Sequence, residues 1–363
     1  MTETSPRLRL GVIGAGAWAI AAHLPAFARR SDVEPLIVSR RDPALLERVR
    51  TDFGFALGST DWHDVIDARP DLIVITGPVG LHAEQVRAAL EVGAHVLCEK
   101  PFTVGPADAW ALSRLADARG RNLMLCYAWN EMGIVEKARA LLEEDGGVGE
   151  VEHVALEMAT VVRELLARGA TYLGRDDYSP PRAETWADPA ISGGGYGQGQ
   201  LTHGIGLLFR LVGLRATQVA AFTSAPDDAP VELHDAIALR FEGGAIGTIG
   251  GASTPPGTFG DRHQLTLRIT GRRGVLALDL GAELVRRSRG PGDDVTLDLT
   301  ADDVRWSFDR VVDRFVDLCA GRTDENRSPA ALGARVVEVL DAAYRSANSG
   351  AIVTVDRTRD RQD

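Results

Sequence analysis

The amino-acid sequence predicts an α/β protein of two domains, a helix-covered parallel sheet followed by an α/β domain with an open, mostly antiparallel sheet. A glycine turn between an apolar strand and a helix opens the chain, and strands then alternate with helical segments as far as residue 128. Beyond that point, long antiparallel-looking strands replace this alternation of strand and helix. We therefore expect one domain over residues 1–128 and a second over residues 129–363.

The composition fits a globular protein with two cores. The 363 residues exceed one ordinary core, and 45% of them are hydrophobic and 25% charged. No apolar run is long enough to cross a bilayer, so we expect no membrane contact. The first residues lack the basic and apolar regions of a secretory signal, which favours a cytoplasmic location.

The net charge argues against a nucleic-acid-binding protein, and the cysteine spacing argues against a protein stabilised by disulfides or zinc. The net charge of -11 would repel phosphate backbones and no basic stripe offsets it, so nucleic acid is not expected as a partner. Cys98, Cys126 and Cys319 follow no C-x-x-C pattern, which argues against a disulfide framework and a structural zinc site. We expect buried reduced thiols and no metal.

The first strand, residues 7–12, leads into a glycine turn and a helix over residues 20–30. Small residues fit the pattern G-x-G-x-x-A there, which lets the backbone approach a pyrophosphate at the helix N-terminus. Glycines also make ordinary tight turns, but the place between strand and helix favours a Rossmann-type dinucleotide site. The expected contacts are Gly14, Gly16, Ala17, Trp18 and Ala19.

The second strand, residues 34–38, ends in Ser39-Arg40-Arg41, where an NAD-selective site usually carries a carboxylate for the ribose hydroxyls. Asp42 lies slightly beyond the strand end. Ser39 and the two arginines suit a 2′-phosphate instead, unless the arginines are simply solvated loop residues. We therefore expect NADP as the cofactor, with NAD as the alternative.

A helix over residues 43–53 and an acidic loop over residues 61–64 precede the third strand, residues 71–76. Its nearly continuous apolar run is typical of a strand covered on both faces, and it breaks at residues 77–80. Ligands collect at the carboxyl ends of such strands, and a helix over residues 83–92 follows. The residues expected at the cofactor here are Thr76, Gly77, Pro78 and His82.

The fourth strand, residues 94–98, ends in Glu99-Lys100-Pro101. Lys100 is one of only two lysines in a chain with 40 basic residues. An amine, unlike a guanidinium, can lose its proton near neutral pH when burial or a neighbouring charge lowers its pKa. Position 100 therefore suggests a titratable amine, although a solvated lysine paired to Glu99 is the plain alternative.

The remaining segments complete the first domain and build the second. Residues 165–189 show no period and predict a long loop, either a lid or binding segment or a disordered excursion. Helices are predicted over residues 106–120, 132–145, 308–319 and 329–347. Strands are predicted over residues 123–127, 149–162, 218–223, 233–241, 245–252, 264–270, 274–279, 283–287 and 352–355.

A glycine-rich stretch over residues 192–203 leads through His203 into a buried helix over residues 204–211. Tyr196 and Gln200 precede His203 by seven and three residues, so an early helix start would place all three on one face. A tyrosine can exchange a proton there and an amide can orient a hydroxyl, whereas turn packing is the alternative. For His203, the alternative to catalysis is a buried core histidine.

These motifs, in this order, resemble the Gfo/Idh/MocA family of oxidoreductases. The resemblance covers most of the chain and implies that Glu99 and Lys100 lie at the cofactor, with Lys100 and His203 as catalytic residues. Most family members carry an aspartate four residues before the histidine, and here that position is Gly199. Gln200 and Tyr196 are the candidates to replace its polarity. The matching segments are residues 14–19, Thr76-Gly-Pro with His82, residues 93–102, and the stretch ending in His203.

The resemblance implies reversible hydride transfer between nicotinamide and a secondary alcohol or ketone of a sugar or cyclitol. It also implies a homo-oligomer formed through the open face of the C-terminal sheet, and a loop at residues 165–189 inserted beside the substrate pocket. Two alternatives stay open because of Gly199. One is a related enzyme that oxidises a sugar transiently so that an adjacent bond is eliminated, and the other is a binding protein that senses cofactor or sugar.

Overall fold

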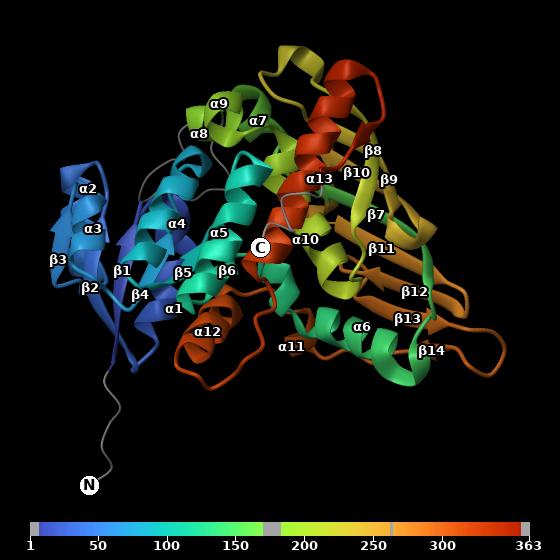
Figure 1. Cartoon of the computed structure of the whole chain (residues 1–363), viewed down its shortest axis with the longest axis horizontal. Coiled ribbons are helices and arrows are strands. Elements are labelled where there is room, and N and C mark those ends of the chain that lie inside the picture. The colour runs from blue at the N-terminus through green and yellow to red at the C-terminus, as the bar shows by residue number, and fades with distance from the viewer. Residues whose placement is uncertain (1–6, 170–182, 262–263, 357–363) are drawn as a thin grey trace, which may run out of the picture.

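The computed structural model describes residues 7–169, 183–261 and 264–356, and it contains two sheets with helices packed between them (Figure 1). In this part of the chain, no helix has both the length and the apolar character that a membrane crossing requires.

Six parallel strands form the first sheet, in the order β3-β2-β1-β4-β5-β6. The order reverses between β1 and β4, so the carboxyl ends of these two strands flank the crevice where such sheets bind ligands. Every residue of β4 is buried, in keeping with its continuous apolar run. The strands are β1 (Leu8–Ile13), β2 (Val33–Ser39), β3 (Leu57–Ser59), β4 (Leu72–Ile75), β5 (His95–Cys98) and β6 (Leu123–Leu125).

The helices of this domain begin and end close to the predicted residues. Two short elements differ from the prediction, because the edge strand β3 was not expected and the acidic loop contains the helix α3. Both elements are shorter than a window in which a hydrophobic period can be recognised. The helices are η1 (Ala19–His23), α1 (Leu24–Ala28), α2 (Pro43–Asp52), α3 (His63–Asp67), η2 (Val79–Leu81), α4 (His82–Glu91) and α5 (Pro106–Arg119).

Nine strands form the second sheet, in the order β14-β13-β12-β11-β7-β10-β9-β8-β15. Among the strands of the described residues, only β7 and β10 of this sheet pair in parallel, so the predicted fold class is confirmed. The strands are β7 (Val151–Thr160), β8 (Ala216–Ser224), β9 (His234–Phe241), β10 (Ile246–Ser253), β11 (Gln264–Gly271), β12 (Gly274–Asp279), β13 (Leu284–Ser288), β14 (Val295–Thr296) and β15 (Val353–Thr354).

Helices cover one face of this sheet and leave the other open. The helices α6 (Gly133–Glu143), α10 (Thr202–Leu211) and α13 (Ala330–Ser349) lie on the side that faces the first domain (Figure 1). Strand β9 alternates between buried and exposed positions, as expected of a sheet covered on one face. Exposed side chains on the open face include Ala236, Ala238, Thr248 and Thr266.

One helix of the predicted second domain packs on the first domain. The helix α12 (Phe308–Cys319) lies in the predicted second domain, but it packs against α1 of the first domain. Its residues Phe308 and Phe315 share a hydrophobic core with Leu10 and Val12 of β1. After α12 the chain passes β6, where the N–H of Leu125 donates to the carbonyl of Ser328 at 2.8 Å. The division into residues 1–128 and 129–363 stays a prediction, with α12 packed on the first sheet.

The segment predicted as a long loop is partly helical. It contains α8 (Ala183–Ala187) and overlaps the end of α7 (Arg163–Arg168) and the first residue of α9 (Pro189–Ser192). Each of these helices is too short to produce a clear hydrophobic period. Trp186, which the prediction placed in the loop, lies on α8. The other residues singled out there, Tyr172, Asp176, Asp177, Tyr178, Pro180 and Pro181, lie outside the described residues.

Candidate active site

The glycine turn lies at the carboxyl edge of the first sheet, between β1 and β4. Gly14 has a φ of +83°, and a Cβ there would stand 2.9 Å from the backbone of Gly77. Only glycine lets the two loops approach so closely. Thr76 ties β4 to the turn, because its hydroxyl donates to the carbonyl of Gly14 at 2.9 Å. With the helical segment of η1 and α1 directly behind it, the turn fits a dinucleotide pyrophosphate.

The residues after β2 differ in their surroundings. The carbonyl of Ser39 accepts the N–H groups of Gly14 and Ala15, so Ser39 supports the glycine turn through its backbone. Arg40 donates from Nη1 to the carbonyl of Ala15 at 2.6 Å, whereas Arg41 is exposed. The carboxylate of Asp42 accepts the N–H of Leu45 and caps α2. The two arginines therefore supply the charge at the strand end itself.

Lys100 extends from the end of β5 toward the glycine-rich segment. Its Nζ donates to the carbonyl of Gly199 at 3.1 Å and lies 5.4 Å from the centre of the Trp186 ring. Burial lowers the pKa of the Lys100 amine, and the neighbouring Glu99 offsets part of this shift. Lys100 thus has the surroundings that a titratable amine requires, and its catalytic role stays a prediction.

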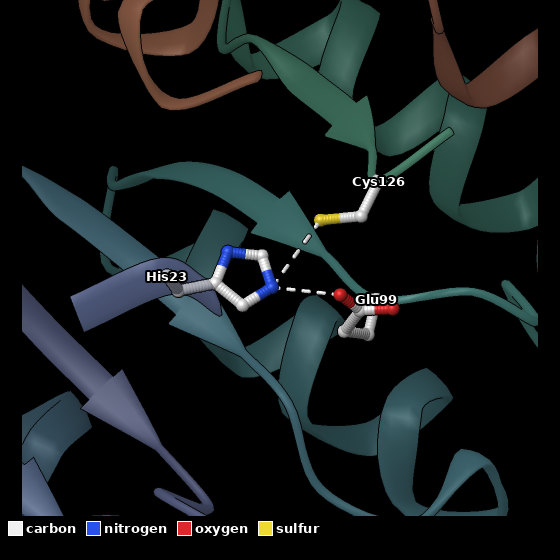
Figure 2. A group of neighbouring side chains, drawn as sticks. All are labelled: His23, Glu99 and Cys126. Atoms are coloured by element: carbon white, nitrogen blue, oxygen red, sulfur yellow. Dashed lines mark hydrogen bonds and ion pairs between the residues drawn. The ribbon is translucent and has the colours of Figure 1, made fainter. Parts of the chain in front are cut away.

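Three N–H groups converge on the buried carboxylate of Glu99. Oε1 lies 2.9 Å from Nε1 of Trp18 and 2.7 Å from Nε2 of His23, and Oε2 accepts the backbone N–H of Lys100 at 3.1 Å. Burial raises the pKa of Glu99, but the hydrogen bond to His23 and nearby charges lower it further, so the net shift is downward. In Figure 2, Nε2 of His23 faces both the Glu99 carboxylate and Sγ of Cys126, and the sulfur lies 4.0 Å from this nitrogen.

His23, Glu99 and Cys126 offer ligand atoms within 4.8 Å of one another, a spacing that also suits a metal ion. A histidine nitrogen and a carboxylate oxygen that share a zinc ion stand roughly 3 Å or more apart, because each bond is about 2.0–2.2 Å. The 2.7 Å between Nε2 and Oε1 is instead a hydrogen-bond distance. Burial raises the pKa of the Cys126 thiol well above its usual range. We interpret the cluster as hydrogen-bonded, and the expected absence of metal stays a prediction.

His82, predicted to contact the cofactor, is a buried residue between two loops at the carboxyl edge of the first sheet, and its contact with the cofactor stays a prediction. The side chain is buried, with Nε2 2.9 Å from the carbonyl of Gly77 and Nδ1 3.0 Å from the carbonyl of Pro101. Burial lowers the pKa of the ring. His82 therefore joins the loop after β4, which contains Gly77 and Pro78, to the loop after β5.

The glycine-rich stretch becomes helical earlier than predicted, through the π-helical turn η5 (Gly197–Leu201) that leads into α10. A turn with i→i+5 hydrogen bonds holds one more residue than an α-helical turn, so α-helical spacings no longer mark one face. Tyr196 is fully buried, where its hydroxyl donates to the carbonyl of Met158 and accepts from Thr160, both at 3.2 Å. Burial raises its pKa, which does not favour proton exchange near neutral pH, and the catalytic role of Tyr196 stays a prediction.

Gly199 leaves open space beside the amine of Lys100. A Cβ at this position would meet no atom within 4 Å, and its carbonyl accepts the bond from Nζ. Gln200 is half-buried in the same turn, and its role stays a prediction. His203, at the start of α10, lies against an aromatic wall, with its ring 5.5 Å from Trp129 and 6.2 Å from Tyr127.

A clamp formed by Glu232 and Tyr344 holds the glycine-rich stretch and was missed from the sequence. The Glu232 carboxylate accepts the N–H of Gly195 at 2.8 Å, the N–H of Gly197 at 3.0 Å and the hydroxyl of Tyr344 at 2.7 Å. A Cβ at Gly197 would stand 2.7 Å from the Tyr344 hydroxyl. These glycines therefore permit close approach as well as a turn. The two clamp residues are distant in sequence, and no local pattern marks them.

Comparison with known proteins agrees with this geometry. A family model described as "Oxidoreductase family, NAD-binding Rossmann fold" matches residues 8–127, and one described as "GFO/IDH/MocA C-terminal domain" matches residues 135–277. The chain is 36% identical over 152 residues to a dTDP-3,4-didehydro-2,6-dideoxy-alpha-D-glucose 3-reductase of Streptomyces violaceoruber, covering 41% of this chain and 44% of that protein. It thus spans less than half the length of this reductase.

Two other similar proteins match over nearly the whole chain. A D-xylose 1-dehydrogenase (NADP(+)) of Haloferax volcanii is 26% identical over 356 residues, which are 96% of this chain and 100% of that protein. The structure of a levoglucosan dehydrogenase in complex with NADH and levoglucosan superposes with a TM-score of 0.76 at 21% identity, covering 97% of this chain and 100% of that one. The two family models match consecutive segments, residues 8–127 and 135–277, which together make up most of the chain. The chain therefore belongs to the Gfo/Idh/MocA family of oxidoreductases.

Proposed function

We propose that this chain is an NAD(P)-dependent oxidoreductase that interconverts a secondary alcohol and a ketone of a sugar or cyclitol. The observation that carries this proposal is the half-buried amine of Lys100 at the carboxyl end of β5, next to the dinucleotide crevice. Membership of a family with an NAD-binding Rossmann domain supports the cofactor class. The names of the similar proteins support a sugar as substrate.

The nicotinamide would supply the acceptor or donor for hydride. In the oxidative direction, Lys100 accepts the hydroxyl proton and its positive charge then stabilises the developing oxyanion. The carbonyl of Gly199 orients the amine by accepting its hydrogen bond. His203 positions the substrate hydroxyl or relays its proton from the start of α10.

Within this proposal, NADP is the preferred cofactor. Arg40 and Arg41 follow β2 directly, and Asp42 is engaged in capping α2. Arg41 is exposed and available to a 2′-phosphate, while Arg40 is also bonded to the glycine turn. The name of the Haloferax volcanii relative includes NADP(+), which supports the same choice.

The enzyme is further proposed to be a cytoplasmic homo-oligomer. Free thiols at Cys98, Cys126 and Cys319 suit a reducing compartment. The open face of the second sheet carries short exposed side chains such as Ala236 and Ala238, which allow two flat surfaces to approach closely. Sedimentation of the purified protein tests this part directly, and a monomer at micromolar concentration would contradict it.

A panel of sugars, cyclitols and keto-sugars tests the reaction, with the absorbance of the reduced nicotinamide as the readout. We expect reduced cofactor to accumulate with at least one cyclic polyol, and ketone reduction to consume it. Two alternatives predict other results. Product without net change in the cofactor would indicate transient oxidation followed by elimination. Tight cofactor binding without turnover on any substrate would indicate a sensor.

A further inference from the structure

Two π-helical turns in the described chain, η1 and η5, lead to the same pair of residues, Glu99 and Lys100. The turn η1 ends at His23, whose Nε2 lies 2.7 Å from Oε1 of Glu99. The turn η5 contains Gly199, whose carbonyl accepts from Nζ of Lys100 at 3.1 Å. Single π-helical turns are rare and often occur at functional sites. Two π-helical turns that are far apart in the sequence thus contact the adjacent side chains of Glu99 and Lys100.

The carboxylate of Glu99 is held firmly in place. Glu99 is 5% exposed and His23 is fully buried. Trp18 shares Oε1 with His23, and Phe308 of α12 packs edge-on against both rings, at 5.3 Å and 4.9 Å between ring centres. Hydrogen bonds to the charged form of a carboxylate favour that form, so these donors keep Glu99 ionised despite its burial.

The other titratable groups around Glu99 contribute little charge. Burial raises the pKa of both Cys98 and Cys126, and it lowers the pKa of His82. These three side chains are therefore neutral near pH 7. From α12 comes the ring of Phe308, and from η5 the neutral carbonyl of Gly199. The titratable groups that face Glu99 from the elements packed on it are His23, His82, Cys98, Cys126 and Lys100.

Resting on the function proposed above, we propose that His23 is a positioning residue, which holds Glu99 as a fixed anion behind Lys100. The pH at which the catalytic amine releases its proton then depends on a buried contact that touches neither substrate nor cofactor. An opposite charge nearby favours a protonated amine. Loss of the His23 hydrogen bond would let Glu99 take up a proton more readily or move away. Lys100 would then release its proton at lower pH.

The chain offers a direct test, because Lys100 and Lys137 are its only two lysines. Protein labelled with ¹³C at lysine Cε gives two titratable resonances, which Lys137→Arg assigns. Lys137 lies on α6 in an ion pair with Asp303 at 2.9 Å, so it serves as an internal control. The titration needs no substrate. A failure of the proposed function, seen as no turnover on any sugar, is therefore distinguishable from a failure of this inference.

We expect His23→Leu and Glu99→Gln to lower the midpoint of Lys100 by on the order of one pKa unit, with Lys137 unchanged. His23→Gln keeps an N–H donor near the position of Nε2 and should restore most of the wild-type midpoint. Where turnover is measurable, the acid limb of the rate profile should move by the same amount. If the titration midpoint of the Lys100 amine is the same in Glu99→Gln as in wild type, the proposal is overturned, whether or not His23→Leu folds. A loss of rate that is equal at every pH would indicate a structural role alone.

Discussion

Introducing a carboxylate at Gly199 is the sharpest test of how the charge of Lys100 is controlled. Gly199→Asp should fold, because a Cβ at this position meets no atom within 4 Å. The carbonyl of the same residue is 3.1 Å from Nζ of Lys100, so the new carboxylate would stand roughly 5 Å from the amine. At an effective dielectric constant of about 20, the attraction between this carboxylate and the protonated amine of Lys100 amounts to about 3 kcal/mol. That corresponds to a rise of about two units in the pKa of Lys100.

The matched control is Gly199→Asn, which adds nearly the same volume without the charge. Titration of the ¹³Cε resonance of Lys100 in both variants measures the shift, and the acid limb of alcohol oxidation should follow it. Below that limb, oxidation by the Asp variant should slow by up to roughly a hundredfold relative to the Asn variant. If Asp and Asn variants titrate alike, residue 199 does not govern the charge of Lys100, and the interpretation of the open space is wrong.

Three further predictions concern the amine, the cofactor and stability. Lys100→Arg and Lys100→Met should bind dinucleotide nearly as well as wild type but lose turnover by on the order of a hundredfold, and near-normal turnover of the Arg variant would contradict the titratable amine. Arg40→Asp and Arg41→Asp should weaken NADP more than NAD in fluorescence titrations, and an unchanged ratio of the two affinities would argue against NADP preference. Burial raises the pKa of Glu131 from 4.5 to about 7, partly opposed by Arg327 and Arg314, so the folded state retains a proton that the unfolded chain has released. The free energy of unfolding should therefore fall by about 3 kcal/mol between pH 4.5 and pH 8, and chemical denaturation of Glu131→Gln should lack this part of the slope.

Much of the first domain was predictable because its signals are local. The G-x-G-x-x-A turn, the apolar run that became β4 and the Glu99-Lys100-Pro101 strand end all reside in short contiguous segments. The prediction that position 100 needs an amine also used only composition and one strand end. Burial lowers the pKa of Lys100, and the need for an amine at this position stays a prediction.

What the sequence did not reveal depends on contacts between distant segments. A π-helical turn has the same composition as an α-helical one, so the shift that buries Tyr196 leaves no mark in the residue pattern. The clamp of Glu232 and Tyr344 on the glycine-rich stretch brings together segments that are far apart in the chain. The return of α12 to the first sheet likewise reflects tertiary packing, because its amphipathic pattern specifies a buried face but no partner.

The two ends of the nine-stranded sheet restrict how copies of the chain can join. Each outermost strand, β14 and β15, has only two residues, and beyond β15 the N–H of Ala221 on β8 is taken by the hydroxyl of Ser346. A strand from another chain can pair with a sheet edge only where the edge strand presents a row of unpaired N–H and C=O groups. Edge strands of two residues present very few such groups. Growth into an open-ended ribbon of chains is therefore disfavoured. If the proposed homo-oligomer forms through the open face of the sheet, a twofold arrangement of the two faces closes on itself.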